Sequence, residues 1–136
     1  MEGTPRRRRV RPSERFEGTQ RLIDLDRAFA SLPAESVARQ GHIQKTIYRH
    51  GATTTAIFQF QAGAGLEEYE LEGQAIIQVV SGTLRVCASD RTYEVGPNHV
   101  LLLDPGVAQE LRAITATRML LTIVLEQGAS DEEVSR

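Results

Sequence analysis

The sequence has 136 residues, of which 40% are hydrophobic and 25% charged, with a net charge of −2. This length allows one domain with a buried core, the composition is typical of a globular protein, and no apolar run is long enough to predict a membrane span. The one cysteine, Cys87, excludes an internal disulfide, and the N-terminus has no secretory leader pattern, so we expect a cytoplasmic protein.

The first predicted segment, residues 1–18, is an arginine-rich arm. Residues 1–15 hold six Arg against two Glu, while the rest of the chain is acidic. Such an arm could engage nucleic acid or another acidic partner. No aromatic residues stand between the arginines to stack on bases, and the body has no basic face. We therefore expect a disordered, solubilising arm without nucleic-acid binding, and a second disordered tail at residues 126–136.

Residues 19–43 are predicted to form one short helix and a linker that pack on the body. The apolar residues of 21–33 recur close to helical spacing. They are Leu22, Ile23, Leu25, Phe29 and Leu32. Pro33 is predicted to end the helix, because proline disrupts a helix interior.

Residues 44–125 predict short strands and no helix. The runs are QKTIYRH, TTTAIFQF, AIIQVVS, TLRVCA, RTYEV, HVLLL, AQELRAI and TRMLLTIVL, with Gly, Pro, Asn and Asp between them. This spacing is typical of an all-β sandwich or small barrel. Both AIIQVVS and MLLTIVL are apolar on two faces, so a helix or another subunit must cover the outer face. We therefore expect a homodimer.

One acidic segment, GLEEYELEG at 65–73, contains four glutamates and leads into AIIQVVS. In an extended chain Glu68, Glu70 and Glu72 share one face. With Gln109 they could bind a hard cation, or two carboxylates could act as acid and base, and Tyr69 could donate a hydrogen bond to a substrate. The third interpretation is a solvated edge that discourages strand pairing, which we favour because buried, unpaired like charges are costly.

Two stretches carry a family resemblance. AIIQVVSGTLRV contains a strand, the turn glycine Gly82 and a second strand, and GPNHVLLLDPGVAQELRA contains the turn Pro105-Gly106. From Gly63 to Ala113 the chain resembles the cupin superfamily, and most closely its short, quercetin-dioxygenase-like members. The resemblance implies an all-β fold: a single antiparallel β-barrel of the jelly-roll type over residues 44–125, with the short helix before it.

The usual cupin metal ligands are replaced in this alignment. Glu68 and Glu70 fall where cupins carry His-x-His, Ala75 falls at the acidic or amide ligand, and Gln109 at the histidine of the second motif. The chain's own histidines fall in predicted loops, where surface or turn roles are expected; they are His42, His50 and His99. We therefore expect a degenerate metal site with no metal and no cofactor.

The leading functional hypothesis is a small-molecule-binding or structural module, whose apolar interior favours a small apolar ligand. The candidate pocket residues are Glu68, Tyr69, Glu70, Gln74 and Gln109. One alternative is a dioxygenase- or isomerase-like enzyme that uses Glu68, Glu70 and Gln109. A second alternative is a dimeric interaction protein that uses the arginine-rich arm.

Overall fold

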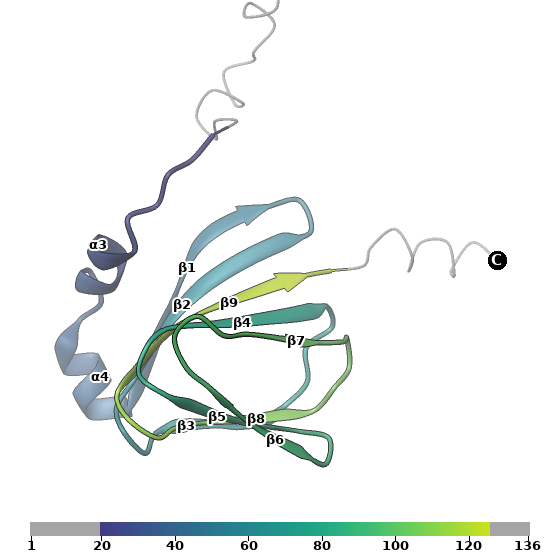
Figure 1. Ribbon diagram of the computed structural model, residues 1–136. Helices are drawn as coiled ribbons and strands as arrows, with labels where there is room; N and C mark the ends of the chain where they lie inside the picture. The colour runs from purple at the N-terminus through teal and green to yellow at the C-terminus, as the bar shows by residue number, and fades with distance from the viewer. Residues whose placement is uncertain (1–19, 126–136) are drawn as a thin grey trace, which may run out of the picture.

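The computed structural model describes residues 20–125, without the side chains of Glu68 and Tyr69. The predicted arm at 1–18 and the tail at 126–136 lie outside the described residues. Within them the chain forms two facing antiparallel sheets, with two short helices beside one of the sheets (Figure 1). The predicted all-β fold is confirmed, while closure of the sheets into a barrel stays a prediction. No helix of the described part is long and apolar enough to cross a bilayer.

Residues 19–43 contain two helices, so the prediction of one helix was wrong. Helix α3 spans Leu25–Ala30 and helix α4 spans Ala34–Gln40. Pro33 ends the first apolar pattern, but it is also the N-cap of α4. Proline suits the start of a helix because the N–H group that it lacks has no intrahelical partner there. Helix α4 ends at Gly41, whose φ of 88° is in the left-handed region that glycine tolerates.

Eight of the nine described strands lie close to the runs predicted from the sequence, and the third lies in the acidic segment, which was not among those runs. The strands are β1 (His42–His50), β2 (Thr53–Phe60), β3 (Gly65–Tyr69), β4 (Gln74–Ser81), β5 (Leu84–Ala88), β6 (Arg91–Val95), β7 (Val100–Leu103), β8 (Gln109–Ala113) and β9 (Thr117–Val124). The first sheet has the order β1-β2-β9-β4-β7 and the second has the order β3-β8-β5-β6. Strands that are distant in the sequence are therefore neighbours, as β9 is between β2 and β4.

The core lies between the two sheets, where alternate residues of each strand point inward. On β4, Ala75, Ile77 and Val79 are buried, while the residues between them are more exposed. Other strands of both sheets contribute large side chains to the same core, and these include Phe58, Phe60, Leu84, Leu111 and Met119. The interior is therefore filled by aliphatic and phenyl groups, in agreement with the apolar interior expected from the sequence.

Glycine is required at positions 65 and 82, where the backbone of another segment comes very close. A Cβ atom on Gly65 would lie 1.9 Å from the carbonyl oxygen of Leu111. Gly82, the expected turn glycine, has a φ of 89°, and a Cβ there would lie 2.2 Å from the carbonyl oxygen of Ala116. Any larger residue would push neighbouring strands apart at these positions.

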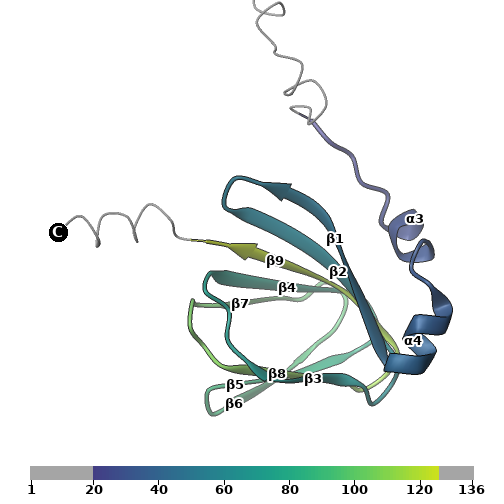
Figure 2. The ribbon, with the colours of Figure 1, turned by 180° about the vertical axis from the view of Figure 1, so that it is seen from behind.

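The outward face of the first sheet is covered over only one half. Helices α3 and α4 lie beside β1 and β2 (Figures 1 and 2). Phe29 and Leu32 from this segment bury Ile57 of β2, and Leu120 of β9 packs against the same cluster. We call this region the covered half.

The rest of that face we call the open half, and it consists of the outward side chains of β4 and β7. Its apolar members are Ile76, Val80, Val100 and Leu102. Val100 and Leu102 are 56% and 58% exposed. In the run MLLTIVL the helical segment covers Leu120, whereas no described part of the chain covers the outer face of β4 and β7.

Candidate functional site

The acidic segment 65–73 is divided between a strand and a connection. Strand β3 ends at Tyr69, so the extended stretch is shorter than the predicted 66–72, and residues 70–73 lead into β4. Glu70 and Glu72 are exposed, whereas Leu71 packs against the core between them. The side chain of Glu68 lies outside the description, so its convergence with Glu70 stays a prediction.

Gln109 is the candidate residue that the structure places in the interior. It begins β8, alternates with the buried Leu111 and Ala113, and is 2% exposed. The strand register pairs its Cα with that of Tyr69, across an irregularity in β3 after Leu66. A buried amide needs hydrogen-bond partners, because it both donates and accepts. Gln109 therefore places a polar side chain between the two sheets, at the end of the molecule where β8 begins.

The loop at residues 104–108 joins the segments around Gln109. The Gly106 N–H donates to the carbonyl of Leu71 at 3.0 Å, and the Ser89 N–H donates to the carbonyl of Ala108 at 3.4 Å. These bonds connect the β3–β4, β5–β6 and β7–β8 connections at one end of the molecule. We call this region the Gln109 end.

Two hollows flank the loop at the Gln109 end. One, of about 660 Å³, is lined by Glu70, Leu71, Glu72, Pro105 and Gly106. The other, of about 200 Å³, is lined by Cys87, Ser89, Ala108, Gln109 and Glu110. Gln109 and Glu70 were among the residues predicted from the sequence, whereas Ser89 and Ala108 were not, because loop residues that are distant in sequence carry no shared pattern. The turn residues Pro105 and Gly106 were the available signal.

Gln74 does not join this group. It begins β4 on the face opposite to Ala75, Ile77 and Val79, which point into the core. Its half-buried side chain therefore lies on the outward face of the first sheet, in line with Ile76. The structure brings together Glu70 and Gln109 at one end and separates Gln74 from them.

The metal-ligand positions of the cupin resemblance do not fit a histidine-held metal. Ala75 has no donor atom, and the amide of Gln109 has no imidazole nitrogen. Among the side chains described at 20–67 and 70–125, no three His, Cys, Asp or Glu residues come together as a metal site.

The histidines lie at three separate places. His42 was expected in a loop, but it begins β1 and stacks on Phe60 with ring centroids 5.6 Å apart. His50 ends β1 and is exposed. His99 is in the predicted turn, where its Nδ1 accepts the Gly96 N–H at 2.9 Å, which assigns it a turn-stabilising role.

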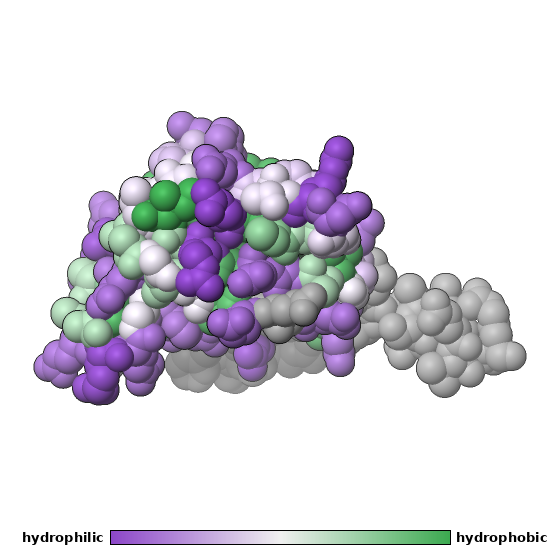
Figure 3. Space-filling model, turned by 90° about the horizontal axis from the view of Figure 1, so that it is seen from below, coloured by the Kyte–Doolittle hydropathy of each residue, from purple (hydrophilic) through white to green (hydrophobic). Residues whose placement is uncertain are grey.

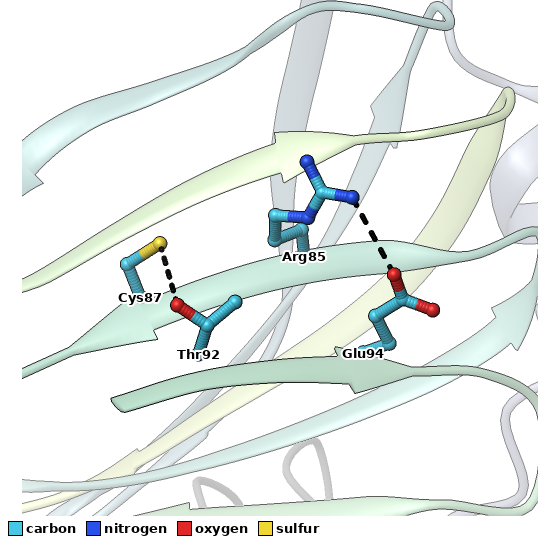
Figure 4. Close-up of polar contacts among 4 residues, drawn as sticks. All are labelled: Arg85, Cys87, Thr92 and Glu94. Atoms are coloured by element: carbon cyan, nitrogen blue, oxygen red, sulfur yellow. Dashed lines mark hydrogen bonds and ion pairs between the residues drawn. The ribbon is translucent and has the colours of Figure 1, made fainter. Parts of the chain in front are cut away.

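The outward face of the second sheet carries many hydrophilic side chains, with smaller hydrophobic patches among them (Figure 3). Arg85 of β5 contacts Glu94 of β6 at 3.4 Å, and the Cys87 sulfur lies 3.6 Å from the Thr92 hydroxyl (Figure 4). Exposed ion pairs of this kind contribute about 0–1 kcal/mol. These contacts make a solvated outer surface.

Arg112 belongs to that same outward surface. It contacts Glu110 at 3.8 Å and donates to the carbonyl of Gly63 at 2.8 Å. The guanidinium of Arg112 therefore interacts with a neighbour on β8 and with the backbone just before β3. The carboxylate of Glu70 lies at the Gln109 end, at the other end of β3.

The fold is similar to several solved structures. No protein-family model matches the sequence, and no curated protein matches it. The cupin domain of Schizosaccharomyces pombe Cnp3 has a TM-score of 0.64 and 13% identity over 69% of this chain and 72% of that one. A cupin superfamily protein from Desulfitobacterium hafniense has a TM-score of 0.60 and 15% identity over 62% and 78% of the two chains.

An RmlC-like cupin from Desulfovibrio desulfuricans has a TM-score of 0.58 and 22% identity, over 63% of this chain and 84% of that one. At sequence identities of 13–22%, these structural similarities show a shared fold and no more. The chain therefore has the fold that these cupin proteins share.

Proposed function

We propose that this chain is a cupin-fold module that binds a small molecule at the Gln109 end. The observation that carries the proposal is the placement of Gln109, a nearly fully buried amide that also lines a hollow open at that end. A buried polar group beside a concave surface is the arrangement by which many sites orient a ligand. The proposal retains our interpretation that the usual histidine ligands are replaced in this chain.

The two hollows favour a ligand with an apolar body and one hydrogen-bonding group. Leu71 and Pro105 offer apolar surface in one hollow, and Gln109 places an amide group at the wall of the other. The exposed carboxylates of Glu70 and Glu72 would repel a ligand anion at the same end. We therefore expect neutral, mostly apolar molecules with a hydroxyl or amide to bind in preference to carboxylates of the same shape.

A binding role is better supported than the enzyme alternative. That alternative needs two carboxylates close together in the interior, and Glu70 is exposed in the connection after β3. An exposed carboxylate is surrounded by water, which screens it from a neighbouring acid. Such a pair is therefore poorly suited to divide the roles of general acid and general base. Binding requires only the concave end and the amide of Gln109.

The test is an amide-resolved NMR titration of the whole chain with cyclohexanol, cyclohexanecarboxamide and cyclohexanecarboxylate. We expect the first two to shift the amide signals of Leu71, Ser89, Gly106 and Ala108 with dissociation constants of about 1 mM or tighter. The carboxylate should bind more weakly. The Gln109→Leu variant should bind cyclohexanol and cyclohexanecarboxamide more weakly, because it removes the polar group that orients them, whereas the weaker binding of the carboxylate, which arises from Glu70 and Glu72, should remain.

The matched control is Gln78→Leu, the same substitution at an exposed position on the outward face of β4. It should leave the titration unchanged. The proposal is wrong if none of the three probes shifts signals at the Gln109 end, or if both leucine variants behave like the original chain. Circular dichroism of each variant separates loss of binding from loss of fold.

A further inference from the structure

A further hollow, of about 410 Å³, lies between the last strands of the two sheets. Strand β6 is the last strand of the second sheet and β7 is the last strand of the first, and residues 96–99 connect them. Because β6 runs away from the β5–β6 connection, this hollow lies toward the end of the molecule opposite to the Gln109 end. It is lined by Tyr93, Glu94, Val95, Asn98, His99, Val100 and Leu101, and we call it the His99 hollow. Its volume is in the range of sites for small organic molecules.

The imidazole of His99 is held in one orientation by the β6–β7 connection. The Gly96 N–H donates to Nδ1 at 2.9 Å, and the His99 N–H donates to the Gly96 carbonyl at 3.1 Å. A nitrogen that accepts an N–H must offer a lone pair, so the proton of the neutral ring is on Nε2. No described residue within 20–125 accepts a hydrogen bond from that nitrogen. The ring therefore has one donor left for a ligand.

This tautomer favours an oxygen acceptor over a metal ion. A neutral imidazole binds a metal through a nitrogen lone pair, and the lone pair of His99 already accepts the Gly96 N–H. Among the lining residues Glu94 has the one carboxylate, and it contacts Arg85 at 3.4 Å on the outward face of the second sheet. The Nε2–H group of His99 instead suits a carbonyl oxygen.

The other walls of the His99 hollow favour an uncharged aromatic body. Tyr93 and Leu101 are partly buried and pack against the core, which includes Val95. The phenol ring of Tyr93 offers a surface against which another aromatic ring can pack. No Lys or Arg is among the lining residues, and Glu94 is paired. A charged ligand would therefore lose its hydration without gaining an unpaired opposite charge.

We propose that the His99 hollow is a second binding site, for a neutral aromatic carbonyl compound whose oxygen accepts a hydrogen bond from Nε2–H of His99. The aromatic ring of the ligand contacts Tyr93 and Leu101, while His99 orients the carbonyl. This site shares no lining residue with the two hollows at the Gln109 end. Each site can therefore fail its own test without affecting the other.

The test combines two NMR measurements on the whole chain. Long-range proton–nitrogen correlation at about pH 8, where an imidazole is mostly neutral, should show the His99 proton on Nε2. Titration with benzamide should shift the amide signals of Gly96, His99 and Leu101, with a dissociation constant of about 1 mM or tighter. Benzylammonium, which has the same ring but a charge and no acceptor, should bind at least about fivefold more weakly.

The variant His99→Asp separates ligand binding from the turn-stabilising role. Its Oδ1 lies one bond beyond Cγ, as Nδ1 does, so it can still accept the Gly96 N–H, but an ionised carboxylate has no donor. Benzamide binding should weaken by about three- to tenfold, the loss of one hydrogen bond. The matched control is His50→Asp, an identical substitution at an exposed histidine at the end of β1. It should bind benzamide like the original chain.

Three results would overturn the proposal. They are a His99 proton on Nδ1, an absence of benzamide-induced shifts at the His99 hollow, and equal benzamide binding by His99→Asp and His50→Asp. Circular dichroism identifies a variant that does not fold. If His99→Asp is such a variant, His99→Asn replaces it, because its side-chain oxygen keeps the acceptor without adding a charge.

Discussion

The covered and open halves of the first sheet face the same direction but have different surroundings. On the covered half, Ile57 of β2 has no exposed surface because Phe29 and Leu32 pack on it. On the open half, Leu102 of β7 has a similar aliphatic side chain and is 58% exposed. The difference arises from chain connectivity, because the helices directly precede β1 and reach only that edge of the sheet. An apolar residue on the outward face of a strand therefore suggests that something packs on it, but the sequence does not identify the element that does so.

The largest expected effect comes from removing the centre of the helix cover. Phe29→Ala should lower the free energy of unfolding by about 3–5 kcal/mol, because it leaves a cavity over Ile57 and removes the ring beneath Arg118. Urea unfolding followed by circular dichroism measures this change. The control Leu22→Ala, at an almost fully exposed position, should change it by less than about 0.5 kcal/mol. Equal effects of the two substitutions would show that α3 does not pack on the sheet.

A smaller effect is expected from the start of the same helix. The carboxylate of Asp24 accepts the Arg27 N–H at 3.2 Å and so caps α3. Asp24→Ala should cost about 1 kcal/mol in the same unfolding measurement, whereas Asp24→Asn should cost little, since asparagine caps equally well. If asparagine is as damaging as alanine, the charge of Asp24 rather than its capping bond stabilises the helix.

The smallest effect on folding is expected on the open half. Leu102→Ala should change the unfolding free energy of the monomer by about 0.5 kcal/mol or less, because its side chain is already largely in water. The measurement is urea unfolding followed by circular dichroism. A cost similar to that of Phe29→Ala would mean that the open half is covered within a single chain.

Local patterns predicted the strands well and the helices less well. TTTAIFQF and RTYEV were predicted at the bounds that β2 and β6 have, because alternation and turn residues act over a few positions. Pro33 was misinterpreted as a stop alone, although it also begins α4. Proline can follow the end of one helix and also begin the next. The second helix forms here because the helical segment packs on side chains of β1 and β2.

The candidate site was predicted only in part, because local patterns indicate the face of a strand on which a residue lies but not its contacts with distant residues. Gln109 lies on the inward face of its strand, as alternation with Leu111 requires. Gln74 lies on the outward face, because the inward residues of β4 begin at Ala75. The contact between Leu71 and Gly106 joins residues of separate connections, and no local pattern predicts such a pairing.

The sequence by itself determined where the strands lie, which side chains alternate inward and where glycine must turn the chain. These properties follow from backbone sterics and a period of two, which neighbouring residues set. Only the tertiary structure decided that β9 lies between β2 and β4, where the Thr55 and Thr122 hydroxyls meet at 2.9 Å. It also decided which half of the outer face is covered and which connections meet at the Gln109 end. Such arrangements depend on contacts between residues far apart in the sequence, whose partners become neighbours only when the sheets pair and pack.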